Sequence, residues 1–90
     1  MKKFIIERNI PGAGSFTHAD LVEIAKKSNA VARELNTDYH WIQTYVTEDK
    51  LFCVHIAPDE ETVRKHAAMG CFPVDKVYEV ATIIDPSTAG

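Results

Sequence analysis

Several features that identify common classes of protein are scarce or missing in this 90-residue sequence. Its two cysteines, Cys53 and Cys71, are too few for a disulfide framework and too far apart for a redox or zinc pair, so we expect free thiols. Ten Lys and Arg stand against thirteen Asp and Glu, and this net charge of −3 disfavours nucleic-acid binding, which depends on neutralising phosphates. No apolar run has the length of a transmembrane helix or a signal-peptide core. We therefore expect a soluble, cytoplasmic protein with neither nucleic acid nor membrane as a partner.

Repeats and low-complexity segments are also missing, and the rest of the composition is that of a globular domain. The sequence is 46% apolar and 26% charged, with four Gly and four Pro. A chain this short has material for one core. We predict a single domain over residues 1–90, with 86–90 as a flexible tail.

The first half of the chain predicts a strand and a helix. Residues 3–9 form a short apolar run that the turn chemistry of residues 11–14 ends. Thr17 and Asp20 then make a capping box, and apolar residues follow at three- and four-residue steps as far as Leu35. Residues 36–38 end this helix.

The second half predicts a hairpin, a helix and a last strand. Residues 39–47 and 50–57 are rich in aromatic and β-branched residues, with Glu48-Asp49 as the turn. Asp59 is the expected N-cap of a helix that Gly70 ends, and 74–85 supplies the fourth strand.

This order, βαββαβ, predicts an α+β, ferredoxin-like fold. Right-handed crossovers give an antiparallel sheet in the order fourth, first, third, second strand, with both helices on one face. Strand alternation assigns one set of residues to the helices: Phe4, Ile6, Ile42, Thr44, Val46, Phe52, Val54, Ile56, Val80, Thr82 and Ile84. The open face then receives Ile5, Glu7, Trp41, Gln43, Tyr45, Leu51, Cys53, His55, Val77, Glu79, Ala81 and Ile83. Such an apolar open face predicts a homodimer that pairs through it.

Four residues of that open face are candidates for a catalytic cleft: Glu7, Tyr45, His55 and Glu79. A histidine beside two carboxylates can act as a general base or a metal ligand. Alternatively, these acids pair with basic groups across a dimer interface.

The other histidines form no local metal motif, because His18, His40 and His66 have no partner at i+3 or i+4. A site built from these, from His55 or from Glu61 near His66 would have to be assembled in three dimensions. The loop at 11–15 lacks the third glycine and the Lys-Ser/Thr step of a phosphate loop, so no nucleotide or organic cofactor is indicated.

Several stretches together resemble a known family. They are residues 6–14, 45–50, 53–58, 63–67, Phe72-Pro73 and 84–86. They resemble a small ferredoxin-like family of largely unknown function that includes a nickel-binding protein. The resemblance implies a ferredoxin-like dimer and makes divalent-metal binding, with nickel sequestration, the leading activity. Cys71 departs from it, because that family has a second glycine at this position.

Three classes of function remain open. The first is a divalent-metal-binding protein with nickel or another metal held by imidazole and carboxylate ligands. The second is a small-molecule-binding protein or cofactor-free enzyme of the dimeric α/β barrel type, with His55 as base. The third is a non-catalytic interaction module. The sequence does not decide whether the chain is an enzyme.

Overall fold

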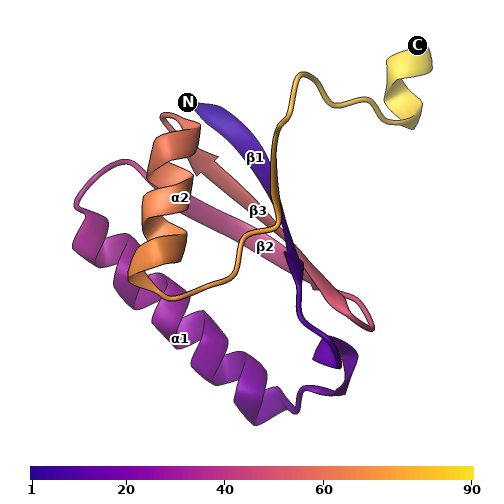
Figure 1. Ribbon diagram of the computed structural model, residues 1–90. Coiled ribbons are helices and arrows are strands. Elements are labelled where there is room, and N and C mark those ends of the chain that lie inside the picture. The colour runs from indigo at the N-terminus through magenta and orange to yellow at the C-terminus, as the bar shows by residue number, and fades with distance from the viewer.

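The computed structural model describes all 90 residues and contains four strands and two α-helices (Figure 1). Their order is β1 (Lys2–Asn9), α1 (His18–Leu35), β2 (His40–Val46), β3 (Lys50–Ala57), α2 (Glu60–Met69) and β4 (Lys76–Glu79), with short 3-10 helices η1 (Ala13–Ser15) and η2 (Pro86–Ala89). Neither α-helix is both long and apolar enough to cross a membrane.

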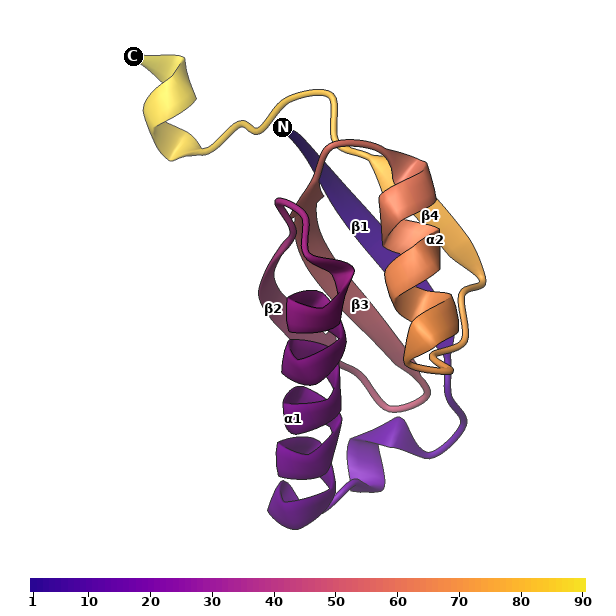
Figure 2. The ribbon, with the colours of Figure 1, turned by 90° about the vertical axis from the view of Figure 1, so that its left-hand side faces the viewer.

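The strands form one antiparallel sheet in the order β2-β3-β1-β4, as predicted. Both α-helices lie on the same face of this sheet (Figure 2). The architecture is therefore α+β and consistent with the predicted ferredoxin-like fold.

Local capping signals place the helix ends where the sequence predicts them. The Thr17 side chain accepts a hydrogen bond from the Asp20 backbone, and the Asp20 carboxylate accepts one from the Thr17 backbone, which completes the capping box. Asn36 ends α1 in the left-handed conformation. The Asp59 carboxylate caps α2 by accepting from the Thr62 backbone, and Gly70 ends that helix.

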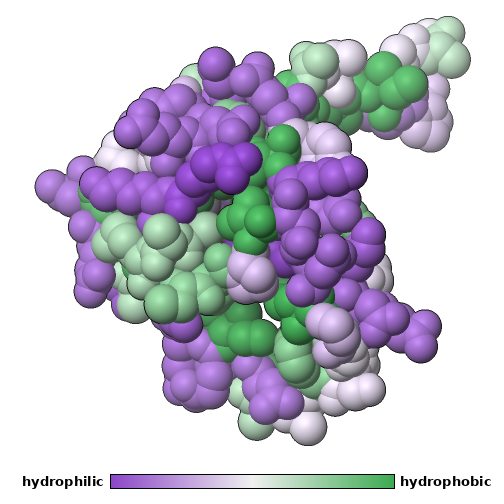
Figure 3. Space-filling model, in the orientation of Figure 1, coloured by the Kyte–Doolittle hydropathy of each residue, from purple (hydrophilic) through white to green (hydrophobic).

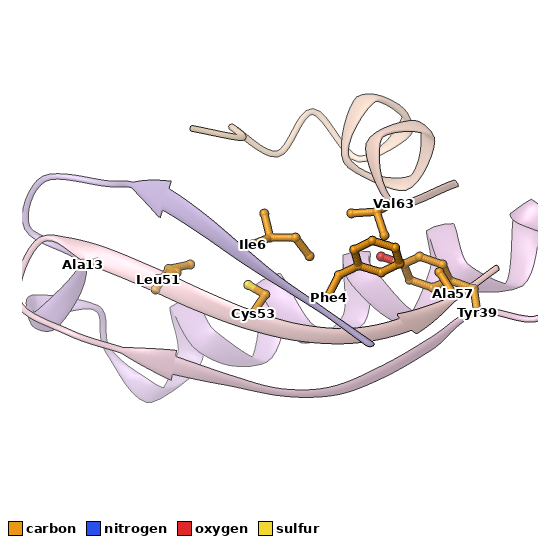
Figure 4. Packing of buried hydrophobic residues seen from close by; sticks show 8 residues of the cluster. All are labelled: Phe4, Ile6, Ala13, Tyr39, Leu51, Cys53, Ala57 and Val63. Carbon is orange, nitrogen blue, oxygen red and sulfur yellow. The ribbon is translucent and has the colours of Figure 1, made fainter. Parts of the chain in front are cut away.

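The hydrophobic core lies between the sheet and the helices (Figure 4). Its largest fully buried apolar side chains are Phe4 and Ile6 of β1 and Val63 of α2. On α1, Ser28 and Val31 are buried, whereas Leu21 and Ile24 near its start are only half-buried. The second half of α1 is therefore packed more tightly than its first half.

The predicted faces of β3 are wrong. Phe4 pairs with His55 and Ile6 pairs with Cys53, and paired residues of antiparallel strands point to the same face. Leu51, Cys53 and His55 thus point toward the helices and are buried. The open face instead receives Phe52, Val54 and Ile56, all half-buried.

The prediction for β2 fails at Trp41, and the prediction for β4 fails throughout. A bulge between Trp41 and Gln43 turns Trp41 to the helix side, opposite His55, while Thr44 and Tyr45 keep their predicted faces. In β4, Val77 pairs with Ile6 and packs against the core. Tyr78 is on the open face as a result.

The fourth strand is shorter than the predicted 74–85. Its last backbone hydrogen bond runs from Val80 to Lys3, and β1 begins at Lys2, so the following residues have no strand to pair with. They extend away from the sheet to the η2 turn, which the Asp85 carboxylate caps. Ile83 and Ile84 on this segment are 65% and 76% exposed, and hydrophobic surface is visible on the projecting segment (Figure 3).

Candidate functional site

A cavity of about 550 Å³ lies between the first half of α1 and the sheet. Its walls are mostly apolar and include Leu21, Ile24 and Ala25 of α1, Trp41 and Thr44 of β2, and Leu51 of β3. The volume is in the range of small-molecule sites, about 300–1,000 Å³. The half-buried state of the apolar residues on α1 follows from this gap beneath the helix.

A group of polar side chains forms one end of this cavity. His55 of β3 and His66 of α2 both line it and are 2% and 1% exposed. The Tyr39 hydroxyl is hydrogen-bonded to His55 Nδ1, and the Tyr39 ring stacks on His66 at 4.6 Å between centroids. His66 Nε2 donates to the Ser28 carbonyl at 3.1 Å, which leaves its buried Nδ1 without a partner.

Burial keeps this group uncharged at neutral pH. Burial above all, then the nearby His66 and Arg8, lower the pKa of His55 from 6.5 to about 3. The pKa of His66 is also lowered by burial, against the opposing effect of its bond to Ser28. Burial raises the pKa of Tyr39 above its ordinary value of 10. Neutral imidazoles beside a neutral phenol can donate and accept hydrogen bonds but do not balance a charge.

Arg8 is the charged residue of the cavity interior. It follows Phe4 and Ile6 on the buried side of β1 and is 3% exposed. Its Nε donates to Cys53 Sγ at 3.4 Å and its Nη1 to the Pro73 carbonyl at 2.6 Å. The guanidinium also lies 5.4 Å from the centre of the Phe72 ring.

A tight turn after α2 brings Phe72 into the cavity wall. Cys71 has a φ of 56°, in the left-handed region that favours glycine. A Cβ at Gly70 would lie 2.4 Å from the Phe72 ring, so only glycine leaves room for the ring here. The turn therefore needs glycine at position 70 and a left-handed backbone at Cys71 to place the Phe72 ring in the cavity wall.

The predicted catalytic cleft is not assembled. His55 points toward the helices and contacts α2, whereas Glu7 and Tyr45 are on the open face. Glu7 pairs with Lys50 at 3.0 Å, and the hydrogen bond from Lys50 lowers its pKa. Glu79 is at the sheet edge, paired with Lys2 at 3.4 Å. The prediction failed because it rested on the wrong faces of β3 and β4.

The candidate metal ligands are brought together only in part. His55 and His66 lie 5.5 Å apart between ring centroids, but His18, His40 and Glu61 are exposed on separate elements. No group of three His, Cys, Asp or Glu side chains is close enough to hold a metal ion. Cys53 also lines the cavity, but it accepts a hydrogen bond from the cationic Arg8. Of the candidate metal ligands, the structure therefore brings together His55 and His66.

Sequence reasoning missed Arg8 and Tyr39 and placed Trp41 on the wrong face. A signal for Arg8 is present, because its position has the same parity as Phe4 and Ile6, and a cation on the apolar side of a strand indicates a buried charge. Tyr39 precedes its strand, and no local pattern connects it to His55.

Comparison with known proteins gives one family and one structure. A family model described as nickel responsive protein SCO4226-like matches residues 4–80. The crystal structure of SCO4226 from Streptomyces coelicolor A3(2) resembles this one with a TM-score of 0.76 and 19% sequence identity, over 91% of this chain and 99% of that chain. No curated protein matches. At this identity the structural likeness supports the fold alone.

Proposed function

The chain belongs to the SCO4226-like family of nickel responsive proteins, and from the cavity beneath α1 we propose that it is a binding protein for a small molecule. One observation carries this proposal. A cavity of about 550 Å³ with apolar walls has a few convergent polar groups, Arg8, His55 and His66, at one end. This combination is typical of ligand sites, where apolar walls supply affinity and a few polar groups orient the ligand.

Calorimetric titration with three eight-carbon probes tests the proposal: octanoate, octanamide and octylammonium. Octanoate and octanamide share the same apolar chain, octylammonium has one methylene more, and the three differ in the charge of the head. We expect at least one to bind and to change the fluorescence of Trp41, the single tryptophan, which lines the cavity. Absence of binding by all three at millimolar concentration would contradict the proposal.

A pair of variants locates the binding. Ala25 lines the cavity, and Ala19 is exposed near the start of the same helix. Ala25→Phe should fill the cavity and weaken binding by about tenfold or more, while Ala19→Phe should leave it unchanged. Equal binding by wild type and Ala25→Phe would place the probe elsewhere.

The family description favours a second candidate function, the binding of a divalent metal with nickel foremost. The free Nδ1 of His66 and the neutral state of His55 support it, because neutral imidazoles are nickel and zinc ligands. Because one chain brings too few ligands together, the others would come from water or from a second copy of the chain.

Titrations with nickel, zinc, copper and cobalt test this second function. Binding should raise the melting temperature by mass action, and His66→Ala or His55→Ala should abolish it. His18→Ala is the control, because His18 is exposed at the start of α1. Flat titrations with all four metals would exclude metal binding without affecting the first proposal.

We also propose that the chain is a homodimer paired through the open sheet face. The half-buried Phe52, Val54 and Ile56 and the exposed Tyr45 and Tyr78 on that face support this. An apolar area of this kind is more stable when a partner covers it.

A further inference from the structure

Arg8 carries a buried positive charge for which the chain provides no negative partner. It is 3% exposed, yet none of the ion pairs of the protein involves it. Its two hydrogen bonds go to the Pro73 carbonyl and to Cys53 Sγ, and no carboxylate contacts it. A buried ion is costly unless an opposite charge lies close to it, so a counter-ion from outside the chain would stabilise this arrangement.

One further cation, Lys27, is among the residues that line the cavity. Lys27 lies on the cavity wall with its ammonium group 5.1 Å from the Phe72 ring, on which Arg8 also lies. The one acidic residue of the lining, Glu23, is exposed and paired with Lys26 at 3.4 Å. His55 and His66 are neutral. The cavity interior therefore presents a cation and no free anion.

The guanidinium also has donor capacity left for a ligand. Nε and Nη1 are engaged, but no partner within the chain accepts from Nη2. This unpartnered Nη2 atom is not fully buried. Because Arg8 lines the cavity, Nη2 is available to a ligand there. A planar guanidinium matches a carboxylate in shape and charge, and charge-assisted hydrogen bonds of this kind are short and strong.

We propose that the cavity beneath α1 takes a small organic monoanion, its carboxylate paired with Arg8 and its apolar body against Leu21, Ile24 and Trp41. This inference rests on the proposed small-molecule function and adds the class of ligand. One interior cation suits a single negative charge, whereas a phosphate dianion would leave a charge unbalanced among neutral groups. Alternatively, Arg8 has a purely structural role, fastening the Pro73 segment to β1, and this role requires no ligand.

The three probes separate these possibilities in the wild-type protein. Octanoate should bind about tenfold or more tightly than its neutral isostere octanamide, and octylammonium should bind weakest. Equal affinity of octanoate and octanamide would overturn the assignment of an anion while leaving small-molecule binding intact. If none of the three binds, the proposed function itself fails.

A variant pair assigns the preference to Arg8. Arg8→Met keeps much of the side-chain length and removes the charge, so the preference for octanoate over octanamide should disappear. Arg33→Met makes the same change of net charge at an exposed residue of α1 that does not line this cavity, and the preference should persist. A preference that survives Arg8→Met would overturn the proposal.

Lys27→Met gives a second measurement if Arg8→Met does not fold. Lys27 is exposed, so its loss should leave folding intact. Octanoate affinity should fall about two- to threefold, and octanamide affinity should not change, because only the anion is attracted by the charge. An equal change for both probes would contradict a positive cavity.

Discussion

His55 illustrates how one side chain changes its chemistry when a strand turns it inward. On an open sheet face it would be a titratable group near neutral pH. Between β3 and α2 it is neutral, bonded to Tyr39 and unable to hold a proton in the physiological range. A buried neutral histidine makes the stability of a protein sensitive to acid, and the direction follows from its pKa.

We expect the free energy of unfolding to fall as the pH is lowered from about 6.5. The pKa of His55 is 6.5 ordinarily and about 3 in the fold, so between these values the unfolded chain binds a proton that the folded chain does not. The contribution of neutral His55 to the free energy of unfolding is therefore complete above pH 6.5 and is lost toward pH 3. At pH 5 the loss from His55 alone is about 2 kcal/mol.

Urea denaturation at about pH 7.5 and pH 5 measures this effect. The His55→Asn variant, whose amide can still bond Tyr39, should lose about 2 kcal/mol less between these two values. The lowered pKa of His66 acts over the same range in wild type and variant, whereas those of Glu7, Asp59 and Asp85 act only at lower pH, because their ordinary values are 4.5, 3.8 and 3.8. An identical pH dependence in wild type and variant would rule out His55 as the cause.

Cys71→Gly should stabilise the protein by about 1 kcal/mol, because glycine adopts the φ of 56° without the steric cost of a Cβ. Thermal denaturation measures the gain as a higher melting temperature. Cys71→Ala is the control, since it removes the thiol but keeps the Cβ and should give no such gain. A gain of equal size in both variants would point to the thiol instead of the backbone.

Among the elements, helix ends and strand existence were predictable, whereas strand faces were not. The capping side chains of Thr17 and Asp59 accept from backbone groups three residues away, so these caps can be recognised from the sequence alone. The faces of β3 depend on its register with β1 and β2. Both alternating sets on this strand are largely apolar, and the Trp41 bulge has no local signature. The candidate residue His55 was therefore assigned to the wrong side of the sheet.

Thr17→Ala should destabilise the protein by about 1 kcal/mol, because the Asp20 backbone loses its acceptor in the capping box. The first half of α1 lies over the cavity, so it has little packing to compensate. Chemical denaturation gives the change, and Thr17→Ser, which keeps the hydroxyl, is the matched control. A Thr17→Ser variant as unstable as Thr17→Ala would show that the methyl group, and not the cap, is responsible.

At the scale of the whole molecule, the order of elements and the sheet topology followed from the sequence, since right-handed crossovers leave few alternatives. The cavity did not, because it results from how far one half of a helix stands from the sheet. The homodimer stays a prediction, and it now rests on a different set of open-face residues from those first assigned.

Light scattering should give about twice the chain mass of 10.1 kDa at micromolar concentration. Tyr45→Glu places a charge at a residue that is 57% exposed on the open face, and it should shift the protein toward monomer without unfolding it. Met69→Glu, at a 40% exposed residue of α2, should leave the dimer intact. A wild-type mass near 10.1 kDa would contradict the prediction.

The two halves of α1 are packed unequally against the sheet, so we expect the less tightly packed half to open first. Leu21, Ile24 and Ala25 line the cavity and are half-buried, whereas Val31 lies beyond it and is buried in the fold. Amide hydrogens of the first two turns should therefore exchange with solvent through local fraying, and those of the last turns only with larger unfolding. Hydrogen exchange read by mass spectrometry would resolve the two halves, and uniform protection along α1 would contradict the expectation. The same turns that form the wall of the cavity would then also be the route by which the proposed ligand enters.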